Sequence, residues 1–288
     1  MLLITAMIWG SAFVAQSKGM DYIGPFTFNV ARNFIGAFVL LPVIALFNRG
    51  KTYEAEEKKL LDKNTLIGGI CCGIVLFIAS SFQQYGLVHT TAGKAGFITA
   101  LYIVIVPLLG LFIGKKVPKI IWGCVALAIV GFWLLCIKEG FTVGLGDLMV
   151  LICAFFYSMH IVTIDHFSPK ADCVKMSCIQ FFVAGIFSLV PMILFEEPVF
   201  SAVLDAKWTI LYAGVLSSGV AYTFQIIAQK HTEPTVATLL MSLEAVFATL
   251  FGWLILKETM LPKEFIGCVL VFIAVIFAQI PIPVKVKK

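Results

Sequence analysis

Charged side chains are scarce in this sequence, since Asp, Glu, Lys and Arg make up only 13% of its 288 residues. A soluble globular domain has about 25% charged and about 45–50% apolar residues. Here the hydrophobic share is 60% and the mean hydropathy is +1.01. The composition therefore excludes one or two ordinary soluble domains and predicts a membrane protein.

The signatures of several other protein classes are also missing. No Gly-x-x-x-x-Gly-Lys loop indicates ATP use. The cysteines are scattered, mostly in apolar runs and without Cys-x-x-Cys or Cys–His pairing, which predicts free thiols rather than a zinc site or disulfides. The net charge of +5 comes mainly from cations between hydrophobic runs, with no basic stripe typical of nucleic-acid binding. We expect no cofactor, no metal and no nucleic-acid partner.

Long apolar runs fill most of the chain instead. A helix of about 20 apolar residues crosses the hydrocarbon core of a bilayer. The runs predict an all-α polytopic membrane protein with ten transmembrane helices, at 1–16, 25–47, 66–85, 91–114, 117–137, 146–164, 174–195, 208–229, 234–256 and 264–279. The charged block at 49–65 is expected to be a solvated cytoplasmic loop.

The order of residues in these runs repeats along the chain. At an offset of 142 residues (231 − 89), Gln83 matches Gln225, His89-Thr90 matches His231-Thr232, and Leu101 matches Leu243. The sequence therefore predicts two five-helix repeats, 1–137 and 146–280, followed by a basic cytoplasmic tail, 281–288. Because five is an odd number, the second repeat must be inverted in the membrane. Transporters with inverted repeats hold their substrate near the midplane.

The positions of the cations predict the orientation. Cytoplasmic loops of membrane proteins carry an excess of Lys and Arg. With the N-terminus inside, only a small set of loop cations lies outside: Lys18, Lys138, Lys207, Lys257 and Lys263. We therefore expect a multi-pass protein of the cell membrane with both termini in the cytoplasm.

Glu244 is an ionisable residue in the ninth predicted span. It lies about ten residues, or about 15 Å, into the helix, near the bilayer midplane. An ionisable group at that depth is a candidate functional residue. The alternative is a buried acid that is hydrogen-bonded to a neighbouring helix. His160, past the middle of the sixth span, is a second candidate for substrate binding or proton coupling, and its alternative is a core histidine.

Other polar or amphipathic side chains lie within the spans, away from the interfaces where aromatic belts form. The predicted substrate-binding residues are Trp9, Gln83, Tyr102, Tyr157, His160, Tyr222, Gln225 and Glu244. For each of them, core packing or helix–helix hydrogen bonding is the alternative. Arg32 and Lys94 are predicted structural or gating charges. Arg32 could bind a substrate carboxylate bidentately, and Lys94 is close enough to the end of its span to snorkel.

Several motifs resemble one known family. They are AMIWGSAF at 6–13, Arg32, AGFIT at 95–99, VPLL at 106–109, SLEAVF at 242–247, Lys257-Glu258 and IGC at 266–268. With them the chain resembles the EamA branch of the drug/metabolite transporter superfamily over nearly its whole length. The resemblance implies ten helices, termini inside, and transport of small metabolites, often outward. In the family pattern an acidic residue follows the fourth span of each repeat. The second repeat has Glu258 at this position, but the first repeat has Lys116 instead.

The sequence thus predicts a secondary transporter, an exporter by resemblance, for small organic metabolites such as amino acids. It would work by alternating access, either proton-coupled or facilitative. A flippase for lipid-linked headgroups is the alternative within the same fold. An intramembrane enzyme is disfavoured because the mid-span ionisable residues are isolated rather than clustered. Oligomeric state cannot be predicted from these features.

Overall fold

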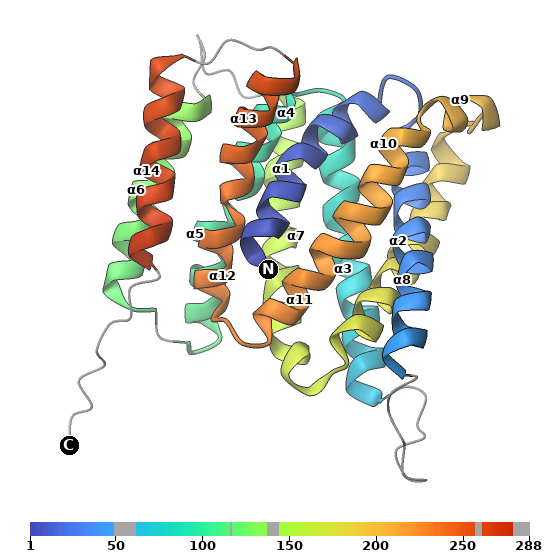
Figure 1. Ribbon diagram of the computed structural model, residues 1–288, viewed down its shortest axis with the longest axis horizontal. Coiled ribbons are helices and arrows are strands. Elements are labelled where there is room, and N and C mark those ends of the chain that lie inside the picture. Colours follow the sequence, from blue (N-terminus) through green and yellow to red (C-terminus); the bar gives the residue numbers. More distant parts are fainter. Residues whose placement is uncertain (49–61, 116, 137–143, 257–260, 279–288) are drawn as a thin grey trace.

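The computed structural model describes residues 1–48, 62–115, 117–136, 144–256 and 261–278. This part of the chain is helical and has no strand. In Figure 1 the helices stand side by side across one common slab. Seven of the described helical segments are long and apolar enough to cross a membrane, and Lys119–Leu134 is a shorter apolar helix. The protein is therefore an all-helical bundle with the composition of a membrane protein.

The helices follow the predicted spans closely. The first half contains α1 (Leu2–Gly19), α2 (Pro25–Asn48), α3 (Lys63–Leu87), α4 (Ala92–Ala100), α5 (Tyr102–Phe112) and α6 (Lys119–Cys136). The second half begins with α7 (Leu145–Phe167), η1 (Ser168–Lys170), α8 (Cys173–Phe195), α9 (Phe200–Asp205) and α10 (Lys207–Leu211). It continues with the π-helical segment η2 (Tyr212–Tyr222), α11 (Thr223–Gln229), α12 (Pro234–Met241), α13 (Leu243–Leu256) and α14 (Pro262–Ala278). The charged block at 49–61, Lys116, Lys138, Lys257-Glu258 and the tail 281–288 lie outside the described residues.

Two predicted spans are interrupted rather than continuous helices. The span 91–114 divides into α4 and α5 at Leu101, and the span 234–256 divides into α12 and α13 at Ser242. At these points the backbone makes short-range bonds, from Leu101 N to Ile98 O (3.1 Å) and from Ala245 N to Ser242 O (3.2 Å). The Ser242 hydroxyl also donates to Leu239 O (2.8 Å), a back-bond that bends helices.

The two halves of the chain are interleaved. The most extensive helix packings all join one half to the other: α3 with α7, α2 with α8, α6 with α14, α3 with α8, and α1 with α13. Gly10 of α1 permits one of these contacts, because a Cβ atom there would lie 2.6 Å from Phe247 Cβ and 2.7 Å from Glu244 O. Small residues at such crossings let membrane helices approach closely.

Ion pairs tie the broken helix α4–α5 to α7 near both ends. Lys94 of α4 pairs with Asp147 near the start of α7, and Lys115, just beyond α5, pairs with Asp165 near the end of α7. In Figure 1 the α1–α2 and α3–α4 connections lie at the top of the bundle. The α7–α8 and α11–α12 connections lie at the bottom.

Candidate functional site

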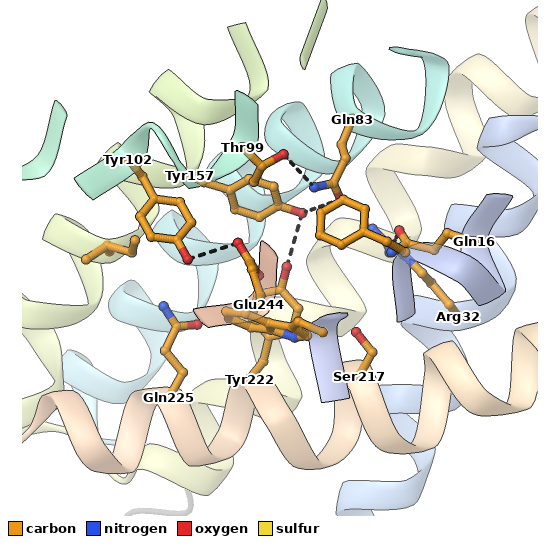
Figure 2. A pocket seen from close by; sticks show the side chains of 13 residues that line it. Gln16, Arg32, Gln83, Thr99, Tyr102, Tyr157, Ser217, Tyr222, Gln225 and Glu244 are labelled. Carbon is orange, nitrogen blue, oxygen red and sulfur yellow. Dashed lines mark hydrogen bonds between the residues drawn. The ribbon is translucent and has the colours of Figure 1, made fainter. Parts of the chain in front are cut away.

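A small cavity of about 30 Å³ lies between the two halves, beside the helix breaks at Leu101 and Ser242. Sites that hold a drug-sized ligand are clefts of about 300–1,000 Å³, so the wall must open further to admit an organic solute. Side chains from both halves form its wall: Trp9, Phe13, Gln16, Arg32, Gln83, Thr99, Tyr102, Tyr157, Ile161, Ser217, Tyr222, Gln225 and Glu244 (Figure 2). The wall is thus half polar and rich in aromatic rings.

A hydrogen-bonded chain crosses the cavity wall from the second half to the first. The Tyr222 hydroxyl donates to the Tyr157 hydroxyl (3.1 Å), and the Tyr157 hydroxyl donates to Gln83 Oε1 (3.1 Å). Gln83 Nε2 in turn donates to Thr99 Oγ1 (3.3 Å). Figure 2 shows these groups pointing toward one another. These hydrogen bonds fix the orientation of the Tyr157 and Tyr222 rings. Gln225 Oε1, also in the wall, has no hydrogen-bond partner in the described residues.

Glu244 lies in the first turn of α13, and its side chain is only 3% exposed. The Tyr102 hydroxyl, from the first residue of α5, donates to Glu244 Oε1 (2.9 Å). The helix break at Ser242 therefore lies beside a carboxyl group of the cavity wall.

Arg32 supplies a cation to the same cavity. Its side chain comes from α2, is 3% exposed, and donates through Nη1 to Gln16 Oε1 (2.7 Å). Its Nε atom has no hydrogen-bond partner among the described residues. Among the described residues no carboxylate forms an ion pair with Arg32. Buried charges in membrane proteins are usually paired, so this guanidinium keeps unused binding capacity.

An aromatic wall closes another part of the cavity. The Trp9 and Tyr222 rings lie 4.7 Å apart, centroid to centroid, and Phe181 supports Tyr222 from behind at 5.6 Å. Trp9 Nε1 has no partner in the described part of the chain. Such rings can contact the apolar part of a small organic molecule.

The structure brings together all but one of the predicted substrate-binding residues. His160 does not line the cavity. It is fully buried behind the wall, with Nε2 3.0 Å from Gln180 Oε1 and its ring against Tyr222. Of the two predicted structural or gating charges, Arg32 faces the cavity, whereas Lys94 is paired with Asp147 at the end of α4.

Five lining residues are not among the predicted ones: Phe13, Gln16, Thr99, Ile161 and Ser217. Helical spacing was an available signal for two of them. Trp9, Phe13 and Gln16 stand at i, i+4 and i+7, which places them on one face of a helix. Thr99 and Ser217 are small hydroxyl residues, and no comparable pattern distinguishes them from packing residues.

A membrane-type helical bundle around a half-polar, mid-helix cavity is the architecture of a membrane transporter. The chain matches the family described as the EamA-like transporter family over residues 1–137 and 144–279. It therefore belongs to the EamA-like transporter family.

Its relatives agree with this assignment. An uncharacterized transporter from Archaeoglobus fulgidus is 32% identical over 280 residues, covering 97% of this chain and 84% of that protein. A WAT1-related chloroplastic protein of Arabidopsis thaliana is 25% identical, covering 95% of this chain and 67% of that protein. A crystal structure that is 19% identical superposes with a TM-score of 0.77, over 96% of this chain and 95% of that one, and shows a shared fold.

Proposed function

We propose that this chain is a secondary carrier that exports small organic metabolites, such as amino acids or related compounds, by alternating access. The observation that carries the proposal is the cavity. It is formed by both halves of the chain, and its wall combines aromatic rings with a cation, a carboxyl group and one amide oxygen, that of Gln225, which has no partner in the described residues. A wall of this kind suits a polar organic solute better than an ion or an apolar molecule.

We further propose ten membrane spans arranged as two inverted five-helix repeats, 1–137 and 146–280, in the cell membrane with both termini cytoplasmic. Two observations support the inversion. The matching connections α3–α4 and α11–α12 lie at opposite ends of the bundle (Figure 1). The helix breaks at Leu101 and Ser242 also fall within one residue of the 142-residue offset (101 + 142 = 243). Discontinuous helices at the repeat interface are a recurring feature of transporter binding sites.

Glu244 is our candidate for coupling transport to protons. It is the carboxyl group of the cavity wall, and a group there can exchange protons with whichever side the cavity faces. The alternative function, movement of lipid-linked headgroups, requires a cavity open sideways to lipid. Low exposure of Tyr102 (3%), Gln225 (1%) and Glu244 (3%) supports a soluble solute instead.

A proteoliposome screen tests the proposal. The purified protein is reconstituted, and uptake of labelled amino acids, nucleosides and cationic drugs is measured with and without a pH gradient. We expect saturable uptake of at least one zwitterionic or polar solute and none in protein-free vesicles. Scrambling of a fluorescent lipid-linked sugar without any solute uptake would favour the flippase.

A further inference from the structure

The cavity wall carries two groups of opposite charge type that do not pair with each other. Arg32 comes from α2 and Glu244 from α13, and Figure 2 shows them in separate parts of the wall. Among the described residues no ion pair joins them. The opposite charges of half-buried Lys94 and buried Asp147, in contrast, do pair directly.

Both groups also keep unused hydrogen-bonding capacity. The Arg32 guanidinium donates through Nη1 to Gln16, but its Nε has no partner in the part of the chain that the structure describes. Glu244 receives only the Tyr102 hydroxyl, on Oε1, and no hydrogen bond reaches its other oxygen within the described residues. A buried guanidinium and a buried carboxylate each lose their hydration, and an uncompensated loss is unfavourable. A ligand that supplies both missing partners would compensate the lost hydration of both groups at once.

The charge balance of the site limits what that ligand can be. One guanidinium and one ionised carboxylate sum to zero, so a ligand with no net charge leaves the buried site neutral. A ligand with only a carboxylate would satisfy Arg32 and leave Glu244 unpaired, and a ligand with only an amine would do the reverse. Like-charge contact and unpaired buried charge are the means by which binding sites reject the wrong ligand.

We propose that the cavity selects zwitterions, with the solute carboxylate bound by Arg32 and the solute ammonium bound by Glu244. Arg32 suits the first role because a guanidinium presents parallel donors that match a carboxylate. The Trp9–Tyr222 wall takes the apolar remainder of the solute. This inference rests on the carrier function proposed above and adds the charge type of its solute.

The test uses solutes that differ only in charge. Alanine, leucine and phenylalanine are each offered as the free amino acid (zwitterion), the amide (cation) and the N-acetyl acid (anion), by counterflow into proteoliposomes. For the unmodified protein we expect at least one free amino acid to be transported about tenfold or more faster than its two derivatives, because each derivative leaves one charged group of the wall without its partner.

Two substitutions should change the preference in opposite directions. Arg32→Gln leaves one carboxylate in the wall, so we expect the amide to be transported in preference to the free amino acid. Glu244→Gln leaves one guanidinium, so the N-acetyl acid should be preferred. Substitution of a residue that only supports the fold would lower the transport rates of all three charge forms together. Ser177→Ala, which removes a buried hydroxyl bonded to Thr223 outside the lining, should keep the original order.

Folding is checked for each variant by elution and melting in detergent, and Arg32→Lys is the second variant if Arg32→Gln is unstable. Arg32→Lys should keep the order of preference with a lower rate for the free amino acid. The proposal is overturned if solutes are transported without regard to charge, or if both substitutions give the same order of preference. Transport of no solute in this set or in the wider screen would overturn the carrier function itself, a separate result.

Discussion

The Tyr102 hydroxyl donates to the Glu244 carboxyl group at 2.9 Å, and the two residues are 142 positions apart. The same offset relates His89-Thr90 to His231-Thr232 in the duplicated sequence (231 − 89). Tyr102 and Glu244 are therefore corresponding positions of the two copies. Corresponding residues can touch only where they lie close to the axis that relates the copies, so this bond marks the centre of the proposed two-fold arrangement.

Removing this bond should lower the stability of the bundle. In Tyr102→Phe the ring stays and only the hydroxyl is lost. We expect a loss of about 0.6–2 kcal/mol in stability, the range measured for hydrogen bonds between membrane helices and to charged groups. Thermal melting in detergent measures this loss. Tyr22→Phe, at an exposed position, is the control and should change neither melting nor uptake.

Replacing the carboxyl group of the cavity should uncouple transport from protons. For Glu244→Gln we expect no stimulation of transport by a pH gradient, because the side chain can no longer bind or release a proton. The measurement is uptake with and without the gradient, using whichever solute the variant prefers. Glu197→Gln changes an exposed carboxylate outside the cavity and should keep the stimulation. A full response to the gradient in Glu244→Gln would remove Glu244 from the coupling mechanism.

His160 provides a contrasting case because it lies one layer behind the wall, against Gln180 and Tyr222. In His160→Gln the amide can still meet Gln180, so we expect uptake and its pH dependence to be retained and the melting temperature to fall by a few degrees. The comparison is a full pH profile of uptake for both proteins. A shift of the pH profile of uptake in His160→Gln would indicate that His160 takes part in proton coupling.

The hydrogen-bonded chain Tyr222–Tyr157–Gln83 should control solute affinity. Tyr157→Phe removes both bonds of its hydroxyl, to Gln83 and to Tyr222. Because each bond contributes about 0.5–1.5 kcal/mol, we expect solute affinity to fall by about three- to tenfold. Concentration dependence of uptake gives this value, with expression and melting as controls. Unchanged affinity would indicate that this part of the wall does not contact the solute.

The close contact of α1 with α13 gives a prediction for Gly10. A Cβ atom in Gly10→Ala would meet Phe247 Cβ at 2.6 Å and the backbone of Glu244 and Ala248 at 2.7 and 2.8 Å. The helices must separate, which should cost about 1–3 kcal/mol and displace Glu244. Gly123→Ala is the matched control, because no atom of the described residues lies within 4 Å of its added Cβ. Similar melting of both variants would contradict the proposed contact.

The sequence predicted the helices and much of the cavity, for a simple physical reason. Long apolar runs determine which segments are helical in lipid, and a polar ring in mid-span, such as Tyr102 or Tyr222, has few alternatives to facing a cavity or a neighbour. The position of a residue along a helix does not determine which way its side chain points around the helix axis. The sequence therefore predicts His160 as a lining residue, although it lies behind the wall. The breaks at Leu101 and Ser242 escaped prediction because neither carries proline or glycine.

The interleaving of the two halves has a consequence for biosynthesis. A ribosome delivers α1 to α6 before α7 exists, yet the main neighbours of α2 and α3 are α7 and α8. Until those later helices arrive, surfaces that are buried in the finished protein must face lipid or an assembly factor. The bundle can therefore close only late in translation, when its last helices supply the missing partners of the first.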